Sequence, residues 1–321
     1  MSSRKGFLFF LSVLTAISVF PWGCSQREDK TGDEATGSGE TQAGVSAFVS
    51  ILPQASFVER IGGGFVQVDV LVELGSNPHI FEPTPRQMVS LGEADVYFGI
   101  GLPFEDRILN KVSDTNPDLT FIKTDEGVSR RSLDTPLSRD QETDQHEHQT
   151  ETGRRESETG ILDPHIWLSY GEILVQAENI LKGLSSVDPP HADEFKTNYR
   201  TFKDELDGVH ARLKNILEPY RGRSFIVFHP AFGYFADTYG LVQVPIEIEG
   251  KSPTPRQIEL LIEHARERNA DIIFVSPQFD KKSANTIARA INGAVVSINP
   301  LEKDVLQNLE TIAKKIETAL R

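Results

Sequence analysis

Cysteine is almost absent from this sequence, which has one cysteine, Cys24, among 321 residues. A single cysteine excludes an internal disulfide, a cysteine-rich zinc finger and an iron–sulfur cluster. Positive charge is also scarce, because 33 lysines and arginines face 47 aspartates and glutamates, for a formal net charge of -14. A nucleic-acid-binding surface needs clustered positive charge, so this composition argues against nucleic acid as a partner.

The apolar run near the N-terminus is too short to cross a bilayer. It covers residues 7–20, whereas a transmembrane helix needs about 20 apolar residues. Arg4 and Lys5 precede it, and a basic segment before a short apolar run is typical of a secretory signal peptide, here residues 1–23. Cys24 follows directly, as the lipidated cysteine does in bacterial lipoproteins, which this start resembles. The alternative is an ordinary cleaved signal with an incidental cysteine.

Behind the signal peptide the composition changes twice. Residues 24–44 hold almost nothing apolar, so we expect the lipidated cysteine and a disordered tether there. The rest of the chain is too long for one core and predicts two domains. We expect an N-terminal lobe over 45–168, linking helices over 169–222 and a C-terminal lobe over 223–321.

The predicted lobes share one sequence pattern, repeated at an offset of about 170–177 residues. Each copy has an apolar strand, an amphipathic helix and a second β-rich run. Thr-Pro-Arg-Gln follows in both copies, at 84–87 and at 254–257, and has the form of a helix capping box. The runs at 94–98 and 270–274 then predict buried third strands. The order β-α-β-α-β predicts an α/β fold of two doubly wound lobes with parallel-rich sheets and a cleft between them.

Two unlike segments separate the copies. Residues 125–160 hold ten acids and five arginines and predict a mobile, solvated loop. Residues 191–218 predict one helix, which would span roughly 40 Å and join the lobes as a rigid strut. Its apolar residues recur every three or four positions, at Phe195, Tyr199, Phe202, Leu206, Val209, Leu213 and Leu217.

Three of the eight histidines, His79, His165 and His229, adjoin predicted strand ends and stand beside prolines. In doubly wound folds the ligand crevice lies outside the carboxyl ends of the strands, so the three could meet between the lobes. Three neutral imidazoles with one open position suit tetrahedral Zn²⁺. A single histidine near a strand end is more often structural, and we assign His191, His210 and His264 to that role because they lie on helices amid charged neighbours.

The motifs around these histidines resemble those of the zinc/manganese-binding solute-binding lipoproteins of bacterial ABC importers, in particular the ZnuA-like zinc branch. They are Asn77-Pro-His79, Asp163-Pro-His-Ile-Trp-Leu168 and His229-Pro-Ala-Phe-Gly-Tyr-Phe235. The resemblance covers roughly residues 45–320. It implies that His79, His165 and His229 are the metal ligands. It also favours zinc over manganese, because manganese members carry a carboxylate at the third position.

The sequence departs from that family at two places. The family's fourth ligand, often an aspartate, aligns with Asn299, a poorer zinc ligand, so we expect water or a nearby carboxylate to complete the shell. Zinc members also often carry a histidine-rich acidic loop, whereas the loop here has only His146 and His148. That pair is either a weak accessory metal site or part of a solvated spacer.

The resemblance implies an extracytoplasmic, lipid-anchored monomer that captures Zn²⁺ and delivers it to the membrane permease of an ABC importer. A manganese-binding homologue and a metal-dependent adhesion protein are the alternatives. A zinc hydrolase is a third, because three histidines and a water also form a catalytic shell. Glu82 and Glu249 are its candidate general bases, but the sequence has no His-Glu-x-x-His motif, so we expect a binding protein and not an enzyme.

Overall fold

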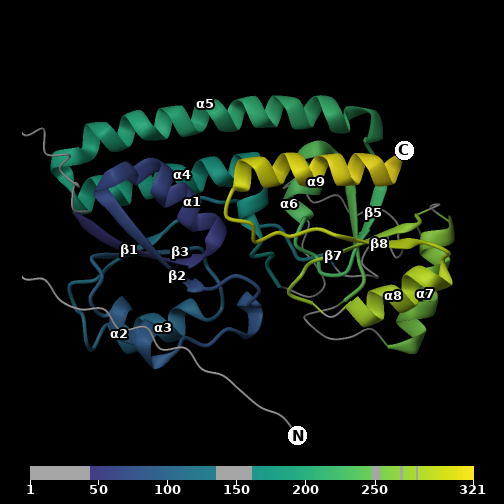
Figure 1. Cartoon of the computed structure of the whole chain (residues 1–321), viewed down its shortest axis with the longest axis horizontal. Coiled ribbons are helices and arrows are strands. Elements are labelled where there is room, and N and C mark those ends of the chain that lie inside the picture. The colour runs from purple at the N-terminus through teal and green to yellow at the C-terminus, as the bar shows by residue number, and fades with distance from the viewer. Residues whose placement is uncertain (1–43, 135–160, 248–253, 268–269, 280) are drawn as a thin grey trace, which may run out of the picture. The chain divides into compact units, whose positions relative to one another are not determined.

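The structure is a computed structural model of the chain (Figure 1). It describes residues 44–134, 161–247, 254–267, 270–279 and 281–321, which all belong to one compact unit, Thr41–Arg321. Within these ranges no helix has both the length and the apolar character that a bilayer span requires. The predicted signal peptide and Cys24 lie outside the described residues.

Two four-stranded parallel sheets form the framework, one in each half of this unit (Figure 1). The first sheet has the order β2-β1-β3-β4, with β1 Val45–Ile51, β2 Val66–Val72, β3 Val96–Gly99 and β4 Thr120–Lys123. The second has the order β6-β5-β7-β8, with β5 Ser224–Val227, β6 Val242–Pro245, β7 Ile272–Val275 and β8 Ala294–Ser297. Counted from its own first strand, each sheet has the same order, which confirms the predicted pair of doubly wound α/β lobes.

Each sheet has a fourth strand that the sequence pattern did not predict. β4 and β8 are edge strands of four residues each, and their side chains are only partly buried. A half-buried edge strand lacks the continuous apolar run that marks a central parallel strand, so its sequence signal is weak.

Short helices connect the strands within each lobe. They are α1 Leu52–Gly62, α2 Pro85–Leu91 and α3 Glu105–Val112 in the first lobe, and α6 Gly233–Tyr239, α7 Pro255–Glu267 and α8 Lys281–Ala290 in the second. Single 3-10 turns occur at Gly63–Phe65, Pro78–Ile80, Ile166–Leu168, Pro189–His191 and Glu218–Tyr220. The predicted capping box begins α2, where the Thr84 hydroxyl accepts from the Gln87 backbone and the Gln87 side chain accepts from the Thr84 backbone.

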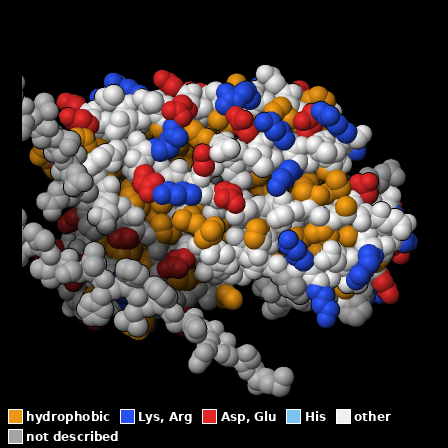
Figure 2. All heavy atoms as spheres, viewed as in Figure 1, with side chains coloured by type: hydrophobic (Ala, Val, Ile, Leu, Met, Phe, Trp, Pro, Cys, Tyr) orange, Lys and Arg blue, Asp and Glu red, His pale blue; other side chains and the backbone are white. Residues whose placement is uncertain are grey.

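Two longer helices, α4 Tyr170–Val187 and α5 Ala192–Leu217, join the lobes along the chain, and a third, α9 Val305–Leu320, packs on α5. The 26-residue α5 confirms the predicted strut and packs on α1 and α4 of the first half and on α9 (Figure 1). Arg212 of α5 pairs with Glu310 of α9 at 2.6 Å. Acidic and basic side chains are interspersed over this face and form no single basic patch there (Figure 2).

One continuous apolar core connects the first sheet, the joining helices, α6 and α9. Trp167, which is almost fully buried, lies within it and donates from Nε1 to the Pro300 carbonyl at 2.7 Å. A smaller apolar cluster lies between the second sheet and helices α7 and α8. The shared core makes the junction between the lobes a packed interface, and the predicted histidines lie at this junction.

Candidate metal centre

His79 is held by a short turn in the loop between β2 and α2. The Asn77 side-chain oxygen accepts from the His79 backbone N–H at 2.9 Å and caps the 3-10 turn Pro78–Ile80. Proline at the first position of this turn has no N–H that would need a partner. The loop therefore presents the imidazole from a defined backbone position, although His79 itself is exposed.

His165 and His229 are buried and come from other parts of the chain. His165 precedes the turn Ile166–Leu168 and is anchored by Asp163, whose Oδ1 lies 2.9 Å from the His165 backbone nitrogen and 2.8 Å from Nδ1. His229 lies two residues beyond β5, and its Nδ1 contacts Oε1 of buried Glu247, two residues beyond β6. Because β5 and β6 are adjacent parallel strands, their carboxyl ends bring this pair together.

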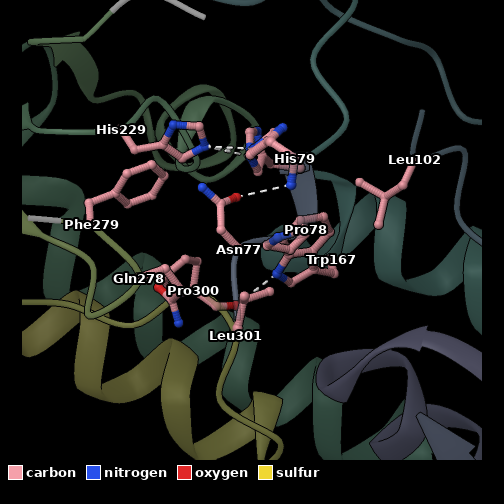
Figure 3. A pocket seen from close by; sticks show the side chains of 11 residues that line it. Asn77, Pro78, His79, Leu102, Trp167, His229, Gln278, Phe279, Pro300 and Leu301 are labelled. Carbon is pink, nitrogen blue, oxygen red and sulfur yellow. Dashed lines mark hydrogen bonds between the residues drawn. The ribbon is translucent and has the colours of Figure 1, made fainter. Parts of the chain in front are cut away.

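The three histidines converge through their Nε2 atoms. Figure 3 shows two of them, His79 and His229, side by side in the pocket. Nε2 of His229 lies 3.1 Å from Nε2 of His79 and 3.0 Å from Nε2 of His165. One ligand atom from each ring lies within 4.8 Å of the other two. Tetrahedral zinc with Zn–N bonds of about 2.05 Å separates two nitrogens by about 3.3 Å. Two of the three separations, those from His229, therefore lie within a few tenths of an ångström of the value that a shared ion requires.

Carboxylates behind two of the rings orient them. Asp163 on Nδ1 of His165 and Glu247 on Nδ1 of His229 favour the tautomer that leaves each Nε2 lone pair facing the other rings. Histidines that bind metals commonly donate their second N–H to a carboxylate in this way. Two of the three histidines therefore already have the tautomer and the orientation that a metal ligand needs.

The surroundings of His79 and His229 keep these two histidines neutral. The pKa of His79 is lowered to about 3, first by burial of the inward side of its ring and then by repulsion from His165 and His229. Although His79 has exposed surface, its Nε2 faces the other two rings, and this inner environment governs the pKa. Burial also lowers the pKa of His229, against the opposing effect of Glu247. Neutral imidazole is the form that binds a metal ion.

The pocket around the three nitrogens is small and largely apolar (Figure 3). Its free volume is about 20 Å³, which is room for one water or one ion. Phe279 stacks on the His229 ring, with centroids 4.6 Å apart. The other apolar lining residues are Pro78, Leu102, Trp167, Pro300 and Leu301.

Other candidates from the sequence do not contribute to this pocket. The Asn299 side-chain oxygen accepts from Gln278 at 2.9 Å, its amide donates to Glu302 at 2.7 Å, and it is not among the lining residues. Glu82 is exposed and also lies outside the lining. The remaining candidates, Cys24, His146, His148 and Glu249, lie outside the described residues.

Two of the three histidines assigned to structural roles make such contacts, and the side chain of His264 is not among those that the structure describes. His191 stacks on Phe65 with centroids 4.0 Å apart. His210 stacks on Tyr170 at 4.1 Å, and its Nδ1 lies 3.2 Å from the Tyr239 hydroxyl.

The sequence did not point to the supporting residue Glu247, and it showed Phe279 only as part of a Pro-Gln-Phe motif that resembles the family, without a role at the site. Glu247 follows the apolar strand β6 as a polar residue that is only 2% exposed, but the sequence alone does not show that burial. Asp163 was visible in the sequence as part of the Asp-Pro-His motif, but its contact with Nδ1 of His165 was not. Support by side chains distant in sequence depends on strand order, which single motifs do not reveal.

Known proteins share this fold and these elements. A crystal structure of ZnuA is 38% identical, with a TM-score of 0.75, over 86% of this chain and 99% of that chain. A zinc-bound ZnuA deletion mutant is 37% identical, with a TM-score of 0.75, over 86% and 98% of the two chains. The zinc-binding protein AdcA of Streptococcus pyogenes is 27% identical to this chain, in an alignment that covers 93% of this chain and 56% of AdcA.

The family match covers nearly all of the folded chain. Residues 48–319 match the family described as ZnuA, zinc-uptake complex component A, periplasmic. The match includes both sheets, the joining helices and all three histidines of the pocket. The chain therefore belongs to the ZnuA family of periplasmic zinc-uptake components.

Proposed function

We propose that this protein captures Zn²⁺ outside the cytoplasm and delivers it to the membrane permease of an ABC importer. Its family is extracytoplasmic and consists of solute-binding proteins, not enzymes. The observation that carries the proposal is the convergence of three histidine Nε2 atoms in a pocket large enough for a single ion. In this proposal His79, His165 and His229 bind the transported ion directly.

The donor set favours zinc over manganese. All three converging atoms are imidazole nitrogens, which suit Zn²⁺, whereas Mn²⁺ prefers carboxylate and other oxygen ligands. Among the described residues that line the pocket, none is a carboxylate. A water completes the tetrahedral shell in this proposal, and Asn299 does not enter it.

Differences in exposure suggest how the ion enters and leaves. His165 and His229 are buried and supported by carboxylates, so they provide a fixed base. His79 is exposed on the loop between β2 and α2. A displacement of this loop would remove one ligand and open the ion to the permease without disturbing the packed junction.

A hydrolase finds no support in the described pocket. The pocket is small, with a free volume of about 20 Å³, and exposed Glu82, a candidate general base, does not line it. We further propose that Cys24 carries the lipid anchor that keeps the protein at the membrane, where the permease is.

Growth in zinc-depleted medium tests the proposed function. In the source organism, deletion of the gene should impair growth, and both the unaltered gene and its His210→Ala variant should restore it. The His229→Ala variant should fail to restore growth while accumulating to the same level. Equal growth with His229→Ala would contradict the proposal.

A further inference from the structure

Arg131 lies where the two lobes meet and contacts three carboxylates. Its guanidinium pairs with Asp134 at 2.9 Å, with Asp163 at 3.1 Å and with Asp237 at 2.8 Å. Its side chain is 17% exposed, so most of this charge is removed from water. Asp237 belongs to α6 of the second lobe, whereas Arg131 follows β4 of the first. One side chain therefore connects both lobes.

The contact with Asp163 leads directly to the metal pocket. Asp163 is fully buried, and its Oδ2 accepts from Nη1 of Arg131. Its Oδ1 lies 2.8 Å from Nδ1 of His165, whose Nε2 faces the pocket. The orientation of the carboxylate behind His165 thus depends in part on Arg131.

The contact with α6 leads to the other buried histidine. α6 begins four residues after His229 in the sequence. Tyr234 of this helix accepts from the Arg131 backbone N–H at 3.1 Å and donates to the Asp163 carbonyl at 3.0 Å. The segments that carry His165 and His229 are therefore joined through Arg131 and its surroundings.

Gly233, the first residue of α6, leaves the space that Arg131 occupies. A Cβ atom there would lie 1.9 Å from Nη1 of Arg131 and 2.8 Å from Oδ2 of Asp163. Gly233 is not among the glycines with positive φ, so its backbone does not itself require glycine. The close approach of the guanidinium is the physical reason for glycine at this position.

We propose that Arg131 is a positioning residue for the metal site, which holds His165 and His229 at the spacing that a single ion requires. The inference rests on the proposed function and deepens it. A ligating side chain whose orientation is fixed before the ion arrives loses less conformational entropy when the ion binds. Residues that support metal ligands typically contribute about 10–100-fold to the affinity for the metal.

Three variants remove this arrangement in different ways. Arg131→Gln removes the charge, Gly233→Ala displaces the guanidinium without changing any charge, and Asp237→Asn weakens only the contact with α6. Arg130→Gln is the matched control. Arg130 is also 17% exposed and contacts the Asp163 carbonyl, but its ion pair is with Asp125 of the same segment.

Each purified protein is titrated with Zn²⁺ against a competing chelator, and its Co²⁺ complex is examined by absorption spectroscopy. Thermal unfolding of the metal-free proteins is measured in parallel. Arg131→Gln and Gly233→Ala should each raise the zinc Kd by about 10–100-fold and alter the cobalt bands. The double variant that carries both changes should raise the zinc Kd little further, because each change removes the same interaction. Asp237→Asn should have a smaller effect, and Arg130→Gln should leave the Kd within about twofold of the unaltered protein.

The outcomes separate this inference from the proposed function. If the unaltered protein does not bind zinc, the proposed function fails, and this inference fails with it. If it binds zinc and Arg131→Gln and Gly233→Ala keep its Kd and cobalt spectrum, only the positioning role is overturned, even where the unfolding temperature falls. Should Arg131→Gln not fold, Gly233→Ala and Asp237→Asn decide the question by the same two measurements.

Discussion

The three imidazoles of the pocket differ in how they are supported. His165 and His229 each have a buried carboxylate on Nδ1, whereas His79 is held mainly through its backbone contact with Asn77. This difference makes two of the rings rigid and leaves the third on an exposed loop. All three should nevertheless be needed for tight binding, because each supplies one of only three protein nitrogens.

Replacement of any one of these histidines by alanine should therefore weaken zinc binding by orders of magnitude, about 100-fold or more. His191→Ala and His210→Ala are the controls, because these rings pack against Phe65 and Tyr170. Isothermal titration with a competing chelator gives the affinities. A zinc Kd for His229→Ala equal to that for His210→Ala would refute the three-histidine site.

The metal-free protein should lose stability as the pH falls below about 6.5. The pKa of His79 is lowered from its ordinary value of 6.5 to about 3 in the folded protein. Between these values the unfolded chain binds the proton that the folded site excludes, so the free energy of unfolding decreases as the pH falls through this window. The shift of His229 has the same sign.

Urea unfolding at pH 7.5 and pH 5, with and without His79→Asn, measures this effect. The variant should lose less stability on acidification than the unaltered protein, because it lacks one of the groups responsible. An equal loss in both proteins would show that His79 does not contribute.

At the scale of helices and strands, elements with a strong apolar pattern could be predicted from the sequence, and elements with a weak pattern could not. The strut helix and the first three strands of each sheet follow from clear apolar patterns in the sequence. The short edge strands β4 and β8 lack that signal. The first part of the acidic segment also differs from the solvated loop that we expected over residues 125–160. Its first ten residues are described, and Arg130 and Arg131 within them are mostly buried by ion pairs that a composition count cannot foresee.

The ends of the acidic segment lie side by side. Ser132 and Leu162 form an antiparallel bridge, and the backbone N–H of Leu133 donates to the Ile161 carbonyl at 3.0 Å. Residues 135–160 connect these ends, so they can be shortened without changing the distance that the chain must cover.

Deletion of residues 137–156 should therefore leave the fold and the tight zinc site intact. It should remove a weak second zinc equivalent if His146 and His148 bind metal, whereas a spacer role predicts identical isotherms. Calorimetry on the full and shortened proteins decides between these two roles. Loss of the tight site would show that the segment carries a primary ligand.

At the scale of the whole molecule, the motifs predicted which histidines to examine, and the topology explains why they meet. His79 and His229 follow β2 and β5, so their place at strand ends was visible in the pattern. The pairing of Glu247 with His229 requires that β5 and β6 be neighbours, and the bridging role of Arg131 requires the packing of α6. Neither relation is encoded locally, because each joins segments far apart in the chain.

The N-terminal segment is expected to set where the protein works. Cys24→Ala should release the protein from the membrane into the soluble extracytoplasmic fraction, because acylation of this cysteine supplies the chains needed for stable retention. Cell fractionation and immunoblotting give the distribution. A variant that is cleaved from its signal yet stays with the membrane would contradict the lipid anchor.

The central claim is that one zinc ion binds between His79, His165 and His229. Its most direct test is the metal content of the protein purified from minimal medium without added chelator, measured by elemental mass spectrometry. We expect about one zinc per chain in the unaltered protein and His210→Ala, and almost none in His229→Ala. A protein that is free of zinc and remains so after incubation with Zn²⁺ would contradict it.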